Sequence, residues 1–372
     1  ASSITASTIS EFVGWQGSYN NITQDTDILA SWIDRTRYYN LTWLDKNGNT
    51  LQSQRVGYGG TVAYSGNDLA AVSGYLWTGF DWKSWAYAAA NLIDESTESI
   101  IISATYDEIT LPPIRDMSNY DYIYSDDYND SSAYTLGELA AIAERHLGAD
   151  YGFEIGDRVK IVFNEDKTIP DTYVICQLER FNDRRLANGG EKDTPHTGGD
   201  FSAFANMSFG MIGTLANARG LHSANTNVGG YAMTTTAAWL DNTVFPCLPP
   251  GWRSLIKLVQ VHSSAGNSSS EMTTSNRKLR LYTAAEVGIY TSEPYASELD
   301  AAREDDGSVV MPFYRSNSRV KKTLNGTGTA QGYWTLSPYF GSSTGFCSVY
   351  NSGGAGNYAA TNANSIAFSF SI

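Results

Sequence analysis

The residue types that most often carry catalysis or hold metal ions are few in this sequence. Neither the His-Glu-x-x-His metal motif nor the Gly-x-Ser-x-Gly nucleophile motif occurs. The histidines are His146, His196, His222 and His262. Because each stands in an unrelated context, they predict neither a metal site nor an acid–base catalyst.

Three cysteines are also far apart and odd in number, with neither zinc-site spacing nor a disulfide framework. A reactive thiol needs surroundings that favour the thiolate. Cys247 lies between Pro246 and Leu248, and Cys347 has apolar neighbours in a strand-like run. We therefore expect Cys176, Cys247 and Cys347 to be buried free thiols that pack as small hydrophobic residues.

Acidic pairs and one glycine-rich segment complete the search for chemistry. We expect Asp126-Asp127 and Asp305-Asp306 to lie in solvated turns, not in a pair of catalytic carboxylates. Residues 326–332 are rich in Gly and Thr, but they do not run from a strand into a helix. A phosphate-binding loop is therefore not expected there.

The formal net charge of −14 is unevenly distributed. Acidic residues outnumber basic ones by 12 to 5 over 1–112 and by 8 to 2 over 113–150, and the two balance at 19 to 18 over 151–322. Residues 323–372 carry no charged residue. Nucleic-acid binding needs a basic surface, so no nucleic-acid partner is expected. No apolar run approaches the roughly 20 residues of a membrane span.

The uncharged C-terminal stretch holds the strongest candidate for a binding surface. Residues 339–365 consist almost entirely of Ser, Gly, Asn, Ala, Tyr, Thr and Phe. Tyr and Phe offer rigid contact area, and Ser, Asn and Gly offer adaptable hydrogen bonds, as in antibody paratopes. The predicted binding residues are Tyr339, Phe340, Ser342, Ser343, Thr344, Ser348, Tyr350, Ser352, Asn357, Tyr358, Ala360 and Thr361. The alternative is a surface loop held by two strands, without a binding role.

Short strands and helices are expected to hold this surface. Ile366, Phe368, Phe370 and Ile372 alternate with small or polar residues, which predicts a half-buried strand. The other elements expected after residue 150 are strands at 159–163, 172–178 and 279–282, helices at 234–240 and 283–287, and a helix-to-strand passage at 252–261.

The first third of the sequence predicts β structure. Strand-like residues 39–44 and 50–56 flank an Asn-Gly turn, which is a strong hairpin signal. Asp45, Asn47 and Asn49 have the spacing that opens a calcium loop, but the Gly and the distal Glu of that loop are missing. A plain turn is expected.

A repeated pattern also occurs in this part of the chain. Residues 12–15 (Phe-Val-Gly-Trp) and 77–80 (Trp-Thr-Gly-Phe) are each followed by an acidic turn and an alternating strand. The pattern predicts that residues 1–36 are the C-terminal part of one β-repeat and that 37–110 form a complete second one. The sequence has neither a starting Met nor a signal peptide, so we expect a piece of a longer or processed protein.

Residues 111–150 are expected to form an acidic linker and a short helix. Over 111–133, tyrosines alternate with aspartates without the period of a core-facing element, which predicts a solvated linker. The clearest helix then begins after Thr135, an N-cap residue with Glu138 three positions later, and can end at Gly148.

The N-terminal repeats resemble a known module. The hairpin at 41–56, the turn at 57–59, residues 74–80 and the strand that ends at Tyr106 are similar to the Listeria–Bacteroides repeat of internalin-type surface proteins. Residues 82–92 depart from it through an insertion. The resemblance implies a small β-grasp-like domain that serves as a spacer or stalk.

The C-terminal region resembles a second family. The segments that carry the resemblance are 227–231, 238–240, 245–249, 281–288, 332–338, 346–349 and 366–370. In this order they are similar to C-type-lectin-like domains of gut bacteria and their phages, which are related to formylglycine-generating enzymes. The resemblance covers residues 151–372. It departs from the pattern at Leu336, where Arg is common.

The same run is similar to variable regions diversified by retroelements, with residues 339–365 as the variable part. The resemblance implies fixed framework residues between the variable ones. These are Trp334, Ser337, Pro338, Phe346, Cys347, Val349, Phe368 and Phe370.

Together these features predict an α+β, β-rich multidomain protein in which small β-grasp-like repeats precede a C-type-lectin-like domain. We expect a non-enzymatic receptor-binding protein on a phage virion, as a tail or head fibre, or an extracellular bacterial adhesin. Its tip would bind a cell-surface protein or glycan, and the protein could form a homo-oligomer.

Two alternatives remain open at this point. One is a structural virion decoration or cell-wall spacer, whose partners are other virion or cell-wall proteins. The other is an oxidase-like enzyme on the formylglycine-generating fold. No cofactor is expected, and a calcium ion in a lectin-like fold would have to lie within 151–322, because the last 50 residues have no acidic side chain.

Overall fold

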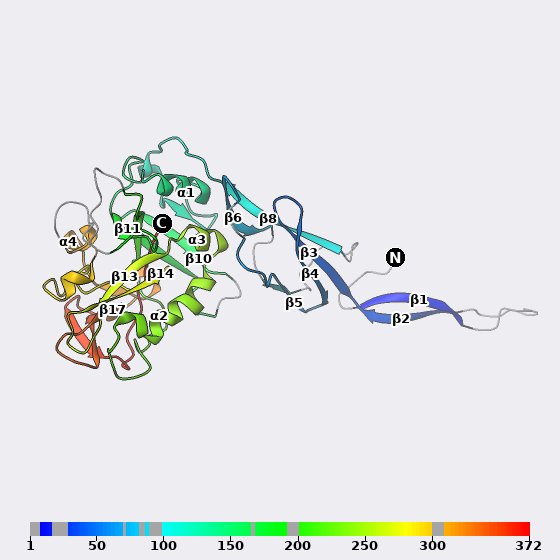
Figure 1. Ribbon diagram of the computed structural model, residues 1–372. Coiled ribbons are helices and arrows are strands. Elements are labelled where there is room, and N and C mark those ends of the chain that lie inside the picture. Colours follow the sequence, from blue (N-terminus) through cyan, green and yellow to red (C-terminus); the bar gives the residue numbers. More distant parts are fainter. Residues whose placement is uncertain are drawn as a thin grey trace, which may run out of the picture. The chain divides into compact units, whose positions relative to one another are not determined.

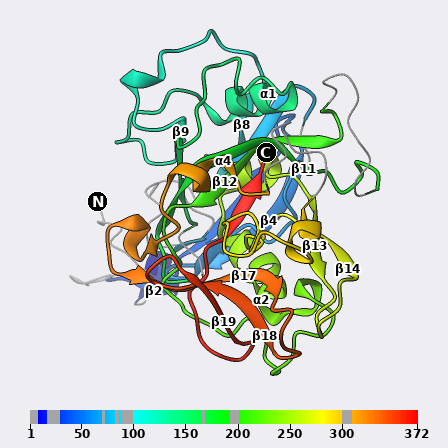
Figure 2. The same cartoon turned by 90° about the vertical axis from the view of Figure 1, so that its left-hand side faces the viewer.

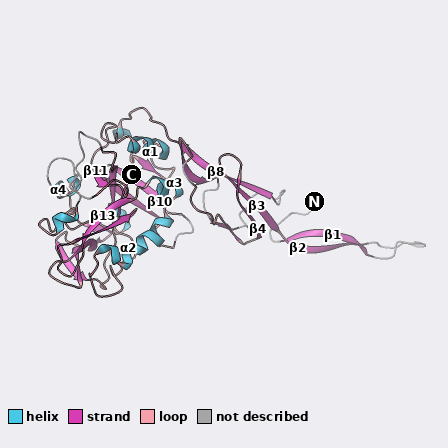
Figure 3. Cartoon of the chain, viewed as in Figure 1, coloured by secondary structure: helices cyan, strands magenta, loops and turns pink. Residues whose placement is uncertain are grey.

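The structure is a computed structural model that describes residues 8–16, 29–69, 72–81, 86–88, 99–164, 168–191, 201–299 and 309–372. Short strands in several small sheets dominate it, with a few short helices (Figure 1 and Figure 3). The chain divides into two compact units. Unit 1 is Ala1–Asp68 with Gly79–Thr105, and unit 2 is Leu69–Thr78 with Tyr106–Ile372. The expected α+β, β-rich multidomain architecture is confirmed at this level.

A four-stranded sheet in the order β4-β3-β8-β6 is the largest sheet of the N-terminal part. β3 (Tyr38–Leu44) and β4 (Thr50–Gly57) form the predicted antiparallel hairpin, and β3 also pairs in parallel with β8 (Ser99–Glu108). β6 (Tyr75–Phe80) lies beyond β8, and the boundary between the units falls within β6 and β8. The buried core of unit 1 is Tyr39, Leu41, Trp43, Val56, Val62 and Ile102.

The turn of this hairpin is the plain turn that the sequence predicts. The Asp45 carboxylate accepts hydrogen bonds from the Asn49 side chain and from the backbone N–H groups of Asn47 and Asn49, each at 2.8 Å. These bonds, that of the Asn49 side chain first, lower the pKa of Asp45. Gly48 takes a φ of +82°, which few residues other than Gly adopt. The carboxylate therefore stabilises the loop itself.

The expected repeat has a counterpart in the backbone. β1 (Thr8–Gln16) pairs antiparallel with β2 (Leu29–Thr36), and its register shifts at Gly14. Gly14 has a φ of +144°, and Gly79 of the second repeat has a φ of +139°. The two aromatic-x-Gly-aromatic segments thus share an unusual conformation that requires glycine. A further two-stranded sheet pairs β5 (Thr61–Ala63) with β7 (Ala86–Ala88).

Unit 2 is built around a five-stranded sheet in the order β20-β12-β11-β10-β9. Its strands are β9 (Tyr124–Ser125), β10 (Arg158–Val162), β11 (Tyr173–Arg185), β12 (Phe204–Met211) and β20 (Ser369–Ser371). β9 is parallel to β10, and the other pairs are antiparallel. The C-terminal strand, red in Figure 2, therefore pairs with a strand more than 150 residues earlier.

The linker expected over 111–133 is instead part of unit 2. Ile123 is fully buried, and the Asp126 carboxylate accepts hydrogen bonds from Val162 N at 3.0 Å and from Trp252 Nε1 at 3.2 Å. Burial raises the pKa of Asp126 to about 7. Asp126 was expected in a solvated turn, and this expectation is wrong.

Asp127 and Asp130 explain why this acidic segment folds. Lys160 of β10 forms ion pairs with Asp127 at 3.0 Å and with Asp130 at 2.8 Å, so part of the acidic charge is neutralised by the adjacent strand. The sequence does not predict that this segment folds onto β10. Individual contacts with distant residues hold the segment, and such contacts leave no periodic pattern of apolar residues in the sequence.

Helix α1 (Leu136–Glu144) begins as predicted. The side chain of Thr135 accepts a hydrogen bond from Glu138 N, and the side chain of Glu138 accepts one from Thr135 N, which is a complete capping box. The helix ends earlier than Gly148, however, because His146 adopts a left-handed φ of +57°.

The helices between residues 234 and 256 agree with the predictions. α2 (Thr235–Trp239) continues through irregular helical turns to Cys247, and α3 (Pro250–Leu255) leads into β13 (Val259–Ser264). β13 pairs antiparallel with β14 (Met272–Arg277). The remaining short elements are α4 (Pro312–Ser316), β15 (Lys321–Lys322) and β16 (Ala330–Gln331).

Three expected C-terminal elements differ from the structure. Residues 283–287 were expected to form a helix, but they form turns, in which Val287 N donates to Thr283 O at 3.5 Å and Gly288 N donates to Ala285 O at 2.9 Å. No regular strand covers 279–282, where only Arg280 makes an isolated bridge, to Ser369. Residues 366–372 were expected to be half-buried, but every one of them is buried and only Ser369–Ser371 form a strand. The small serines that alternate with Phe368 and Phe370 face other parts of the core and not solvent.

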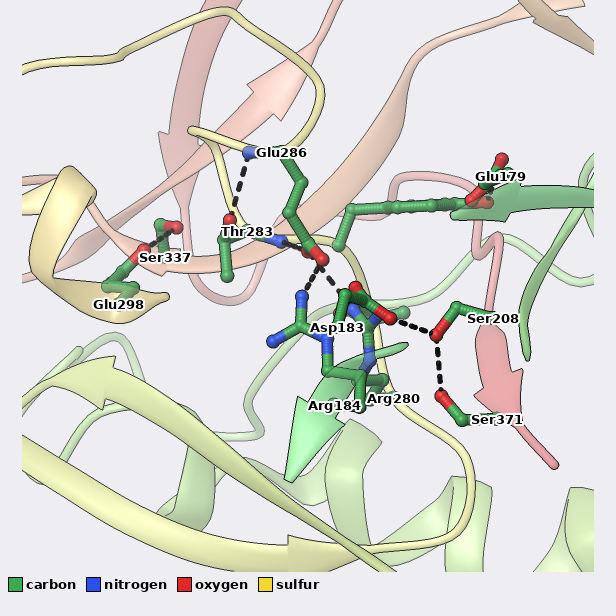
Figure 4. Close-up of polar contacts among 12 residues, drawn as sticks. Glu179, Asp183, Arg184, Ser208, Arg280, Thr283, Glu286, Glu298, Ser337 and Ser371 are labelled. Carbon is green, nitrogen blue, oxygen red and sulfur yellow. Dashed lines mark hydrogen bonds and ion pairs between the residues drawn. The ribbon is translucent and has the colours of Figure 1, made fainter. Parts of the chain in front are cut away.

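A cluster of buried charges joins the main sheet of unit 2 to the loop that follows β14 (Figure 4). The Glu286 carboxylate is fully buried, and it pairs with the guanidinium groups of Arg184 and Arg280, the latter at 3.0 Å. It also accepts a hydrogen bond from Thr283 N at 2.7 Å. Asp183, next to Arg184, accepts a hydrogen bond from Ser208 of β12.

We predict that Glu286→Gln lowers the free energy of unfolding of unit 2 by about 3–5 kcal/mol. The variant removes the ion-pair partner of the buried Arg280 and leaves the buried Arg184 with the longer contact to Asp183, at 3.4 Å. Urea unfolding followed by tryptophan fluorescence measures the change. The exposed Glu271→Gln is the matched control and should stay within about 0.5 kcal/mol of the wild type. A loss below about 1 kcal/mol for Glu286→Gln would contradict the importance of the cluster.

Candidate functional site

The candidate binding surface is carried by a three-stranded antiparallel sheet, shown in orange to red in Figure 2. It consists of β17 (Tyr333–Pro338), β18 (Gly345–Val349) and β19 (Ala355–Ala359). All eight predicted framework residues are buried: Trp334, Ser337, Pro338, Phe346, Cys347, Val349, Phe368 and Phe370. The sheet therefore has a tightly packed interior.

The twelve predicted binding residues divide into three groups by exposure. Seven are exposed and are called the C-terminal face below: Phe340, Ser343, Tyr350, Ser352, Asn357, Tyr358 and Thr361. Tyr339, Ser342 and Thr344 are half-buried. Ser348 and Ala360 are completely buried, so their assignment to an exposed surface is wrong.

Ser348 is buried because β18 is the central strand of its sheet and is covered on both sides. β18 ends at Val349, directly before Tyr350, so Tyr350 does not continue the face of this strand. Tyr350 packs instead against Tyr358 of β19, edge to face, with ring centroids 5.7 Å apart. Tyr358 in turn packs edge to face on the buried Trp334 at 6.1 Å.

These ring contacts leave both tyrosines partly available to a ligand. Tyr350 and Tyr358 are each 37% exposed, and Phe340 is 42% exposed. Rings that are fixed on one side by packing lose little entropy when they bind a partner. The arrangement therefore suits a contact surface made from rigid aromatic side chains.

The loop that connects β17 to β18 is held by a residue outside the sheet. The amide nitrogen Nδ2 of buried Asn227 donates hydrogen bonds to the carbonyl groups of Ser342 and Gly345, both at 2.7 Å. Asn227 N donates to Ser343 O at 2.9 Å, and Asn227 Oδ1 accepts from Asn267 N at 2.8 Å. Sequence reasoning included Asn227 only as part of a family segment and missed this role. Nothing in one sequence marks a buried Asn that bonds to a loop more than 100 residues later.

A second segment supports the same loop from residues 290–298. The Tyr295 hydroxyl accepts a hydrogen bond from Phe340 N at 3.0 Å, and the Tyr295 ring stacks on Tyr290 at 5.1 Å. Tyr290 also contacts Tyr339 at 6.1 Å. Tyr339 thus packs mainly against residues below the face. This packing explains why its side chain is half-buried, although an exposed side chain was expected.

Glu298 fixes the start of this support. It is fully buried, accepts a hydrogen bond from Ser264 N at 3.1 Å, and also accepts one from the Ser337 hydroxyl at the end of β17 (Figure 4). Burial raises the pKa of Glu298 to about 8. The carboxyl group is therefore largely protonated near neutral pH, which lessens the cost of enclosing it.

The cysteines are free and buried, as predicted. Burial raises the pKa of the Cys176 and Cys347 thiols, which disfavours the nucleophilic thiolate. In the parts of the chain that the structure describes, no three His, Cys, Asp or Glu side chains gather as a metal site would require. His196, Asp305 and Asp306 lie outside the described residues.

Within the same described ranges, no helix combines the length and apolarity needed to cross a bilayer. Two clefts among the described residues of unit 2 have volumes of about 420 and 410 Å³, and neither is lined by a residue of the C-terminal face. The face therefore offers an outer surface for contact and is not part of these clefts.

Comparison with known families finds one match. Residues 211–367 match a family described as Domain of unknown function (DUF6273). The match covers less than half of the chain, and it includes Asn227, the supporting segment 290–298 and the sheet β17-β18-β19. Comparison with curated proteins and with solved structures found no match. The five-stranded sheet of unit 2 extends beyond the matched range, because β9, β10 and most of β12 precede it.

We predict that Asn227→Ala frees the loop between β17 and β18. The variant removes the hydrogen bonds to Ser342 and Gly345, so unfolding should be easier by about 2–3 kcal/mol. Hydrogen exchange at residues 339–345, followed by mass spectrometry, should become faster. The neighbouring exposed Asn225→Ala is the control and should match the wild type. Unchanged exchange in Asn227→Ala would show that other contacts hold the loop.

The raised pKa of Glu298 predicts a pH dependence of stability. Its folded pKa of about 8 exceeds the ordinary value of 4.5, so its contribution is complete below pH 4.5 and is lost as the pH rises toward 8. The free energy of unfolding should fall over this range by up to about 1.4 kcal/mol per pH unit. Asp126 acts in the same direction up to about pH 7.

Glu298→Gln should make this slope shallower by about 1.4 kcal/mol per pH unit between pH 5 and 7.5 and leave the contribution of Asp126, measured by urea unfolding at a series of pH values. The exposed Glu271→Gln should keep the wild-type slope. If Glu298→Gln and the wild type had equal slopes, the carboxyl of Glu298 would not be protonated in the folded protein.

Proposed function

We propose that this protein is a non-enzymatic binding protein whose C-terminal face contacts a ligand on another cell or particle. The observation that carries the proposal is the contrast between an exposed, uncharged, aromatic surface and the fully buried framework beneath it. Side chains at the seven exposed positions can differ without disturbing the core, whereas the framework residues cannot.

The composition of the C-terminal face supports a contact with an uncharged region of the ligand. Phe340, Tyr350 and Tyr358 supply apolar contact area, and the other four residues are Ser, Asn and Thr. A charged ligand surface would lose water here without gaining an ion-pair partner, which is unfavourable. Because residues 323–372 carry no charge, an uncharged protein or glycan surface is the ligand that suits this face best.

The proposed setting is a phage virion or a bacterial cell surface, with unit 1 as a spacer. The order β4-β3-β8-β6 with a parallel central pair supports a β-grasp-like repeat of the internalin type. The small sheet with variable-looking surface residues supports a C-type-lectin-like tip, diversified by a retroelement. The DUF6273 match adds no function to this proposal.

The test is attachment of the fluorescently labelled full chain to a panel of gut bacterial cells, measured by flow cytometry. The combined substitutions Phe340→Ala, Tyr350→Ala and Tyr358→Ala should reduce binding to positive cells at least about tenfold, because aromatic anchors dominate interface energies. Circular dichroism should show an unchanged fold.

The matched control is Tyr128→Ala, which removes a tyrosine that is 87% exposed and lies outside the face. It should bind as the wild type does. Undiminished attachment of the triple variant would place the binding surface elsewhere. Loss of assembly into particles without loss of cell attachment would instead favour the structural role of a virion decoration.

A further inference from the structure

One cleft of unit 2 lies apart from the C-terminal face and has an unusual lining. Its volume is about 410 Å³, within the range of small-molecule sites. β10 and β11 contribute Arg158 and Gln177, α4 contributes Phe313 and Tyr314, and β15 contributes Lys321. Four elements of the packed body of unit 2 thus contribute to the cleft, together with the 3-10 turn at Leu324–Gly326 and adjacent loops.

The charge of this lining opposes that of the whole protein. Arg158 and Lys321 line the cleft, and no Asp or Glu does, although the chain has a net charge of −14. Across the described parts of the chain, no carboxylate lies within ion-pair distance of either residue. The cleft therefore presents Arg158 without an ion-pair partner among the described residues, next to Lys321, whose ammonium group interacts electrostatically with the buried Glu179.

Lys321 is the more constrained of the two cations. The residue is only 3% exposed, and its ammonium group lies 4.9 Å from the ring centroid of Tyr282, 5.6 Å from that of Tyr314 and 5.7 Å from that of Tyr333. It also donates a hydrogen bond to Met211 O. Burial lowers the pKa of Lys321. The three rings hold the lysine in place but cannot neutralise it.

The carboxyl group behind the cleft is already engaged. Glu179 accepts hydrogen bonds from the hydroxyl groups of Tyr282 at 3.0 Å and Tyr314 at 2.8 Å, and it is fully buried. It does not line the cleft. Burial raises the pKa of Glu179, which reduces its power to compensate Lys321. An anion that entered the cleft would therefore meet the unpaired charge of Arg158 and the charge of Lys321, which Glu179 compensates only in part.

We propose that this cleft binds a small organic anion, with its carboxylate or phosphate group at Arg158 and Lys321 and its apolar body against Ile212 and Phe313. Gln177 and Tyr314 also line the cleft. The site is independent of the C-terminal face and of the function proposed for it. A role in stabilising unit 2 follows from such binding, because a ligand that binds only the folded state raises its stability.

Isothermal titration calorimetry on the full chain tests the site with four probes. Benzoate and phenylphosphate carry an anionic group on an apolar body, inorganic phosphate lacks the body, and benzylammonium has the body with the opposite charge. We expect benzoate or phenylphosphate to bind, with the better of the two showing whether carboxylate or phosphate is preferred. Inorganic phosphate should bind more weakly, and benzylammonium should not bind.

Variants assign the binding to the cleft. Arg158→Gln, at an exposed position, should raise the dissociation constant of the better anion about tenfold, whereas Lys322→Gln, an exposed neighbour that does not line the cleft, should leave it unchanged. Glu179→Gln should tighten binding by removing the competing carboxyl group. If Lys321→Met folds, by circular dichroism, it should abolish binding.

Three results would overturn the proposal. One is the absence of heat from both organic anions, and another is equal binding of benzylammonium. The third is an equal effect of Arg158→Gln and Lys322→Gln, which would mean that general surface charge attracts the anions. Since Arg158 and Lys322 are both exposed, these outcomes do not depend on whether Lys321→Met folds.

Discussion

The buried carboxylate of Glu286 is the point on which the architecture of unit 2 depends. It neutralises Arg184 from β11 and Arg280 from the loop after β14, and Arg280 also makes the bridge to β20. Charges removed from water are costly unless they are paired. These ion pairs and the bridge from Arg280 to Ser369 join the loop that contains Arg280 and Glu286 to β11 and β20 of the five-stranded sheet.

That loop positions the candidate site. Residues 290–298 support the turn after β17 through Tyr295, and Glu298 is bonded to Ser337 at the end of the strand. Asn227 holds the same turn through its carbonyl groups. Buried polar groups therefore position the loop and strands that carry the exposed aromatic residues. This separation lets the surface be chemically variable while the fold stays the same.

Local sequence signals predicted local structure well. The Asn-Gly turn, the Thr135–Glu138 capping box and the helix-to-strand passage near Trp252 all rest on contacts within a few residues, and each is present. The framework residues were identified from a resemblance, and all are buried.

The predictions that were wrong share one physical cause: the position of each residue depends on contacts with residues far away in the sequence. Asp126 and Ile123 seemed to belong to a linker because their partners are on β10 and α3. Ser348 was placed on the surface because the sequence does not show that β18 is a central strand. The pairing of Arg184, Arg280 and Glu286 spans about 100 residues, and no periodicity marks it. Polar contacts between residues far apart in the sequence therefore determine those features of the site that could not be predicted from a single sequence.

The central claim is that an exposed face that tolerates substitution rests on a buried support that does not. A saturation mutagenesis scan of residues 333–372, sorted once for folding by protease resistance and once for attachment to gut bacterial cells, tests it most directly. The account predicts that substitutions at the seven exposed positions change attachment and leave folding intact. Substitutions at Ser348, Ala360 and the eight framework residues should lower both. Equal sensitivity of folding at exposed and buried positions, or attachment that no exposed position affects, would contradict the account.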